Sequence, residues 1–143
     1  MSAPDGNSYR VHFADPGGRS SVLDVPTEDF ETMERGVSLG STMVVPWHRV
    51  IRYTREVMQP IDDMFLSRAE IRAWLDDGSD DGERIIVRAD RFESSSWTAD
   101  FLVERTLDIE AGMVHLTKLH VPWGRVLEYE RLPVRVEAPS RPD

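Results

Sequence analysis

One short pattern occurs twice in this chain, as "TMVVPWHRVIRYTREV" at residues 42–57 and as "KLHVPWGRVLEYERLP" at residues 118–133. The copies lie 76 positions apart, and from the valine before Pro-Trp onward seven of eleven positions are identical. His48 in the first copy is replaced by Gly124 in the second. Pro-Trp followed by Arg-Val is not a general strand pattern, so we interpret the repeat as an internal duplication. The alternative is coincidence between two strands of similar composition.

Alternating apolar and polar residues predict short strands along most of the chain. Residues 8–14 are an example, followed by the turn signal "DPGG". With the halves aligned at the same offset of 76, residues 9–13 fall opposite residues 85–89. The predicted strands are residues 8–14, 22–25, 37–45, 48–55, 84–89, 97–104 and 134–137, with a hairpin turn at "EAG" inside residues 107–116.

One helix is predicted in the middle of the chain, at about residues 68–76. It begins at "SRAE", which matches a capping box. Ile71, Trp74 and Leu75 would then share one apolar side of the helix. The helix ends in the acidic loop "DDGSDDGE", which we interpret as a solvated loop.

We therefore expect a mainly β (α+β) fold built from two duplicated small β units, each an open barrel or a sandwich, joined by the short helix. The predicted divisions are residues 1–60 for the first β unit with VPWHRV, 61–83 for a linker with the helix and the acidic loop, 84–138 for a second, degenerate β unit with VPWGRV, and 139–143 for a tail.

Composition limits the classes of function. The chain has 143 residues, a net charge of −9 and no cysteine, which excludes disulfides and thiolate metal sites and fits a reducing cytoplasm. No apolar run approaches the roughly 18 residues of a membrane helix, and the first residues do not resemble a secretory signal. A general nucleic-acid binder carries a basic surplus, so any nucleic-acid site here would be local.

Four residues of the first Pro-Trp copy are candidate ligand-binding residues: Trp47, His48, Arg49 and Arg52. Arginine matches phosphate with two hydrogen bonds, histidine donates or titrates near neutral pH, and tryptophan can stack on a base. Each has a structural alternative. Trp47 recurs in the second copy, which suits a core residue; Arg49 recurs too, which suits an ion pair. The difference at His48 suits either a specialised site or drift.

The motif "VPWHRV", closing a unit that begins "YRVHFADPGG", resembles the RNA repair domain family, also called the RNA cyclic-group end recognition domain. The resemblance covers residues 8–55 and includes the His-Arg pair at the end of the unit. It implies recognition of RNA ends that bear phosphate or cyclic phosphate, with His48 and Arg49 as the recognition pair. The family's Arg-Trp-Asp segment is missing before Tyr9, and the second unit lacks the histidine.

Two hypotheses of function follow. The first is a non-catalytic RNA-end recognition domain in RNA repair or processing, whose partners are RNA ends and a protein such as an RNA ligase or nucleotidyltransferase. The second is a protein-interaction or assembly module, monomeric or homodimeric, because small β units with exposed edges pair readily with other strands.

Signals of catalysis and of metal binding are weak. The chain has no Gly-x-Ser-x-Gly elbow and no P-loop, and no catalytic residue or cofactor is predicted. An EF-hand placed on the acidic loop fails because Arg88 takes the position of the bidentate glutamate. His115 and His120 are five apart in strand-rich sequence, on opposite faces, so no metal site is predicted. We expect a binding protein and not an enzyme.

Overall fold

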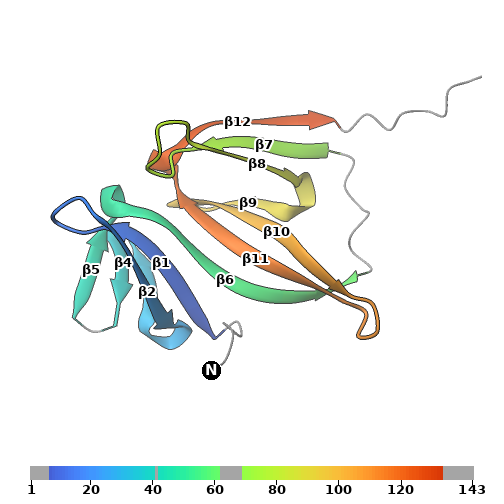
Figure 1. Ribbon diagram of the computed structural model, residues 1–143, viewed down its shortest axis with the longest axis horizontal. Helices are drawn as coiled ribbons and strands as arrows, with labels where there is room; N and C mark the ends of the chain where they lie inside the picture. Colours follow the sequence, from blue (N-terminus) through green and yellow to red (C-terminus); the bar gives the residue numbers. More distant parts are fainter. Residues whose placement is uncertain (1–6, 41, 62–68, 134–143) are drawn as a thin grey trace, which may run out of the picture.

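The computed structural model describes residues 7–40, 42–61 and 69–133, and most of them belong to β-strands (Figure 1). The mainly β prediction is therefore confirmed. The predicted strand at 134–137 and the tail lie outside the described residues. The strands are β1 (Ser8–Ala14), β2 (Ser20–Pro26), β3 (Phe30–Met33), β4 (Gly36–Leu39), β5 (Met43–Pro46), β6 (Val50–Pro60), β7 (Ala69–Leu75), β8 (Glu83–Arg88), β9 (Phe92–Ser94), β10 (Thr98–Asp108), β11 (Met113–Pro122) and β12 (Val126–Pro133).

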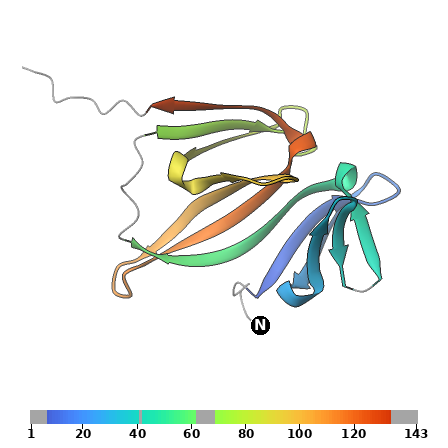
Figure 2. The ribbon, with the colours of Figure 1, turned by 180° about the vertical axis from the view of Figure 1, so that it is seen from behind.

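The strands of the described residues form three antiparallel sheets, with orders β2-β1-β6-β11-β10-β9, β12-β7-β8 and β3-β4-β5. The long strand β6 is the centre of the largest sheet. It pairs with β1 on one side and with β11 on the other. Figure 1, and Figure 2 from behind, show β6 leaving the first group of strands and running beside β11 under the second group.

The same order of elements occurs twice. The first group is a hairpin (β1–β2), a 3₁₀ turn η1 (Thr27–Asp29), three strands (β3–β5), a second turn η2 (Trp47–Arg49) and β6. The second group is β7–β8, η4 (Ala89–Arg91), β9–β11, η5 (Trp123–Arg125) and β12. In each group the first strand pairs with the last. We call these groups the first and the second unit.

Each unit has its own buried core, and six positions of one core correspond to six of the other. From β1 to β4, each position of the first unit corresponds to the residue 62 positions later in the second unit. From β5 onward the difference is 76 positions, because the β10–β11 hairpin is longer than the β4–β5 hairpin. The alignment of residues 9–13 with 85–89 is therefore wrong, since β7 takes the place of β1. The corresponding pairs are Val11/Ala73, Phe13/Leu75, Val25/Val87, Val37/Ala99, Leu39/Phe101 and Val45/Val121.

The helix predicted at 68–76 is wrong, because residues 69–75 form strand β7; residue 68 lies outside the described residues. Burial along β7 alternates with a period of two: Ile71, Ala73 and Leu75 are buried, whereas Trp74 is 43% exposed. Hydrogen bonds to β8 and β12 on its two sides hold the segment extended. Pairing with neighbouring strands thus overrides the local helix signal.

Candidate functional site: a groove between the two Pro-Trp turns

The two Pro-Trp segments occupy corresponding places, since each proline ends a strand and each tryptophan begins a 3₁₀ turn. The Trp47 indole Nε1 donates to the carbonyl oxygen of Met33 (2.8 Å), and that of Trp123 donates to the carbonyl oxygen of Ser95 (2.8 Å). Met33 and Ser95 correspond at the offset of 62. The recurrence of tryptophan therefore reflects one repeated contact that fixes the orientation of each indole.

The repeated arginines also have a structural role. Arg49 Nε donates to the carbonyl oxygen of Ala14 (2.7 Å), at the end of β1. Arg125 Nη1 donates to the carbonyl oxygen of Asp76 (3.4 Å), the corresponding position after β7, and its Nε donates to that of Val50 (3.0 Å). Each guanidinium thus ties its turn to the first strand of its own unit, and Arg125 also reaches the other unit.

The turns η2 and η5 face a common groove of about 450 Å³, which we call the tryptophan groove. The Trp47 and Trp97 rings lie 6.3 Å apart between centroids, with 20° between their planes, and come from different units. The groove therefore offers aromatic faces on both sides. Its lining residues are Trp47, His48, Asp76, Ser96, Trp97, Pro122, Trp123, Gly124 and Arg125.

The one difference between the two motifs lies in this groove. His48 is exposed, and its ring makes no hydrogen bond or ion pair with any residue that the structure describes. Gly124 lines the same groove, and a Cβ built on it would have no heavy atom within 4 Å. Its φ is not positive, so the backbone does not require glycine. Glycine at 124 therefore leaves open space beside His48.

The charges in the groove are balanced. The Arg125 guanidinium is its only permanent cation among the lining residues, and Nη1 lies 3.6 Å from Oδ2 of Asp76. With His48 neutral, the groove carries no formal net charge. Stacking and directional hydrogen bonds, rather than net charge, would select a ligand here.

Of the four predicted residues, the structure brings only Trp47 and His48 into the groove. Arg49 is half-buried behind it and does not line it. Arg52 lies in a separate polar cleft of about 660 Å³ on the face of β1 and β6, where it forms an ion pair with Glu83 (3.1 Å). The predicted cluster of His48 with two arginines is therefore not formed.

His12, which pairs with Arg52 across β1 and β6, also lines this polar cleft. Burial, followed by the positive charges of Arg52 and Arg10, lowers the pKa of His12. These groups concentrate positive charge around His12, although three carboxylates line the same cleft. They are Glu56, Asp77 and Glu83.

The residues that the second unit contributes to the tryptophan groove were not predicted, and Trp97, Trp123 and Arg125 are the aromatic and cationic ones among them. The repeat itself contains the last two, so they could have been found by expecting both copies to face one site. Trp97 carries no such signal. It is placed by the backbone bond from the Trp123 amide to its carbonyl oxygen (3.2 Å), which joins distant segments.

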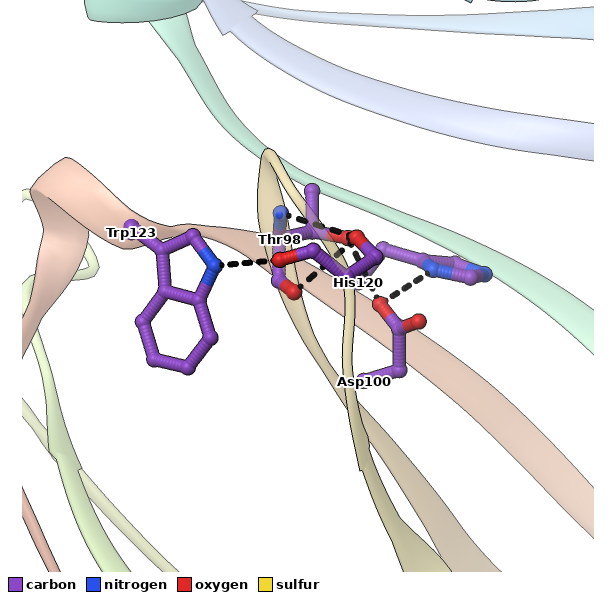
Figure 3. Close-up of polar contacts among 5 residues, drawn as sticks. Thr98, Asp100, His120 and Trp123 are labelled. Carbon is purple, nitrogen blue, oxygen red and sulfur yellow. Dashed lines mark hydrogen bonds and ion pairs between the residues drawn. The ribbon is translucent and has the colours of Figure 1, made fainter.

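A hydrogen-bond chain holds the wall of the groove (Figure 3). Trp123 bonds to the Ser95 carbonyl, and the Ser95 hydroxyl lies 2.9 Å from Oγ1 of Thr98. Thr98 Oγ1 donates to Oδ1 of Asp100 (2.7 Å), which is 2.7 Å from Nδ1 of His120. These bonds fix the turn that carries Trp97 against the centre of the large sheet.

His120, the last residue of this series of hydrogen bonds, contacts the first unit. The rings of His120 and Tyr53 stack with centroids 4.4 Å apart. Burial raises the pKa of the Tyr53 phenol well above its ordinary value. The stack joins the core of the first unit to the wall of the groove.

Neither a metal site nor a membrane helix is found in the described parts of the chain. No three His, Asp or Glu side chains come together there as a metal would require. No helix in those ranges is long and apolar enough to cross a membrane. No protein-family model, curated protein or solved structure significantly matches this chain.

Proposed function

We propose that this protein is a non-catalytic binding protein that recognises an RNA end bearing phosphate or cyclic phosphate, in RNA repair or processing. One observation carries the proposal: an exposed imidazole without a partner among the described residues, His48, shares a groove with three indoles beside the open space at Gly124. Unpaired bases are recognised by stacking on aromatic side chains, and an imidazole can donate a hydrogen bond to a phosphate oxygen.

The three indoles have different roles in the groove: two are fixed by hydrogen bonds within the protein, and one can donate a hydrogen bond to a ligand. Trp47 and Trp123 use their N–H groups within the protein and offer only their faces. Trp97 is 38% exposed, and its N–H has no acceptor within the described ranges. In the proposed complex a terminal base lies against these rings, and the Trp97 N–H donates to the ligand.

The terminal phosphate would lie at His48, with the Arg125 guanidinium as the nearest permanent cation of the groove. Arg49 would act from behind, by holding η2 in place, and Arg52 would take no part. The net charge of −9 opposes non-specific binding to RNA, because phosphate neutralisation normally supplies that affinity. The proposal includes a cytoplasmic location and a partner such as an RNA ligase or nucleotidyltransferase.

The test is a titration with short RNAs that end in 3′-phosphate, 2′,3′-cyclic phosphate or 3′-hydroxyl, at two salt concentrations. Binding is measured by the change in tryptophan fluorescence. We expect preference for the phosphorylated ends. His48→Gly copies the residue of η5 and should weaken binding of those ends about tenfold or more, because a hydrogen bond to a charged group is lost. Gly124→Leu fills the open space and should abolish binding of every RNA.

Glu28→Ala, at an exposed position of the turn η1 and outside the groove, serves as the control and should bind as the native protein does. Gly124→Leu should keep the native unfolding temperature, because nothing lies within 4 Å of the new Cβ. Binding that ignores the RNA terminus, or that survives both groove variants, would contradict the proposal.

A second candidate function, a protein-interaction module, is favoured by the exposed apolar residues of one sheet. Leu127 is 65% exposed and Tyr129 47% exposed on the edge strand β12, and Trp74 and Ile86 are exposed on the neighbouring strands. Unpaired edges with apolar residues are sites of association. Indifference to RNA, together with a mass above that of a monomer in light scattering, would favour this candidate.

A further inference from the structure

A buried charge lies in the second unit, away from the tryptophan groove. Arg91, in the turn η4, is only 5% exposed. The corresponding residue of η1 is Asp29, which is exposed. Arginine stays protonated in proteins, and a buried charge is costly unless it is paired and hydrogen-bonded. Arg91 therefore requires a counter-charge.

The described residues supply that counter-charge only in part. Arg91 Nη1 donates to Oε1 of Gln59 (2.5 Å), which is neutral. Arg91 Nη2 lies 3.6 Å from Oε1 of Glu104, and that oxygen instead accepts a hydrogen bond from Nη2 of Arg88 (3.0 Å). The Glu104 carboxylate is thus shared with Arg88, and the Nε and Nη2 groups of Arg91 have no hydrogen-bond acceptor in the described structure.

The two unsatisfied donors are on one edge of the guanidinium. Nε–H and Nη2–H point in the same direction and form the planar fork that matches two oxygens of a phosphate or carboxylate. Arg91 also lines a cavity of about 230 Å³ that shares no lining residue with the tryptophan groove. The walls of this cavity are Ile86, Val87, Arg88, Arg91, Leu102, Val103 and Glu104.

We propose that Arg91, with Arg88 beside it, is a binding site for a small oxyanion of the phosphate and sulfate class. The anion accepts hydrogen bonds from Nε and Nη2 of Arg91 and balances the charge of Arg91, while Glu104 stays on Arg88. Apolar side chains of β8 and β10 line the site beside the two guanidinium groups. The site does not depend on the proposed recognition of RNA.

The test is the unfolding temperature of the full chain in sodium phosphate, sodium sulfate and sodium chloride, at equal pH and ionic strength, with calorimetric titration of phosphate. A ligand that binds only the folded state raises its stability with concentration. We expect phosphate and sulfate to raise the unfolding temperature over chloride, and Arg91→Gln to remove the difference. Arg84→Gln, at an exposed position of the same strand β8, should keep it.

A second variant tests the site without removing Arg91, whose loss also breaks the bond to Gln59. Glu104→Gln removes the competing carboxylate and should tighten phosphate binding several-fold. If Glu104 were instead the full counter-ion of Arg91, Glu104→Gln would lower stability in every salt without any specific effect of phosphate. That result, or equal unfolding temperatures in all three salts, would overturn the proposal.

The RNA titrations, repeated with Arg91→Gln, distinguish a free anion from a phosphate of RNA. We expect an unchanged preference among RNA ends, because the two sites share no residue. Loss of that preference in Arg91→Gln would overturn the assignment to a free anion.

Discussion

Arg125 and Trp123 illustrate what a repeated residue does in this chain. Their counterparts Arg49 and Trp47 make corresponding bonds to carbonyl oxygens of their own unit, so the recurring side chains hold the turns in place. His48 makes no such bond to any residue in the described ranges. At the residue scale, recurrence therefore indicates structure, and our proposal places binding at the position where the copies differ.

His12 gives the stability of the protein a pH dependence. The pKa of His12 is lowered from 6.5, first by burial and then by the charges of Arg52 and Arg10, so the unfolded chain takes up a proton at a higher pH than the folded protein. Its contribution is present above about pH 6.5 and is lost as the pH falls through the folded-state pKa. His12→Gln should therefore flatten the decrease in unfolding free energy from pH 7.5 to pH 5, measured with urea.

His48→Gln, at an exposed position, is the matched control and should keep the native slope. The pKa of Asp24 is lowered chiefly by its hydrogen bond to Arg10, so its stabilising contribution is present above pH 3.8 and is lost only at more acidic pH, outside this range. An unchanged slope in His12→Gln would contradict this assignment.

The part of the groove that could be predicted from the sequence is the part that the repeat marks. Trp47 and His48 were predicted from the motif, and both line the groove. Arg52 was expected to share a face with His48 by strand alternation, but His48 lies in the turn η2 and β6 begins only at Val50, so the alternation does not include His48. The ion pair with Glu83 holds Arg52 in the polar cleft. Trp97 could not be predicted, because its place depends on a contact between two segments that are distant in sequence.

At the scale of elements, β7 shows why a strand can look like a helix. Positions i and i+4 share a face in both, so Ile71 and Leu75 do not distinguish them. Trp74 does, since a helix would bury it beside Leu75 and the strand turns it outward. Strands β1, β6, β8 and β10 were predicted more easily, because one buried face leaves an alternating pattern, whereas the short strands β3 and β9 were not predicted as strands.

This difference predicts opposite outcomes for two substitutions in β7. Leu75 is fully buried, so Leu75→Ala should lower the unfolding free energy of the protein by about 2–4 kcal/mol, because apolar burial is lost and a cavity is left behind. Trp74→Ala should cost less than half as much, because the ring is 43% exposed. Urea unfolding measures both values, and a larger loss for Trp74→Ala would favour the helix over the strand.

At the scale of the whole molecule, the two units are joined through shared structure. Strand β6 closes the first unit against β1 and also pairs with β11 of the second from Tyr53 to Pro60. Arg125 crosses the same boundary to the carbonyl oxygen of Val50, and the His120–Tyr53 stack lies on it. The tryptophan groove is built from both units, so its geometry depends on this junction.

The junction predicts that both units unfold together. Val11 is fully buried in the core of the first unit, so Val11→Ala should lower the unfolding free energy of the protein by about 2 kcal/mol. Trp74, Trp97 and Trp123 belong to the second unit, so tryptophan fluorescence reports mainly on that unit. In Val11→Ala the urea midpoint should fall equally by fluorescence and by far-UV circular dichroism, in one transition. If the fluorescence midpoint stayed at its native value while the dichroism transition split in two, the units would be independent, and pairing of β6 with β11 would be too weak to define a groove between them.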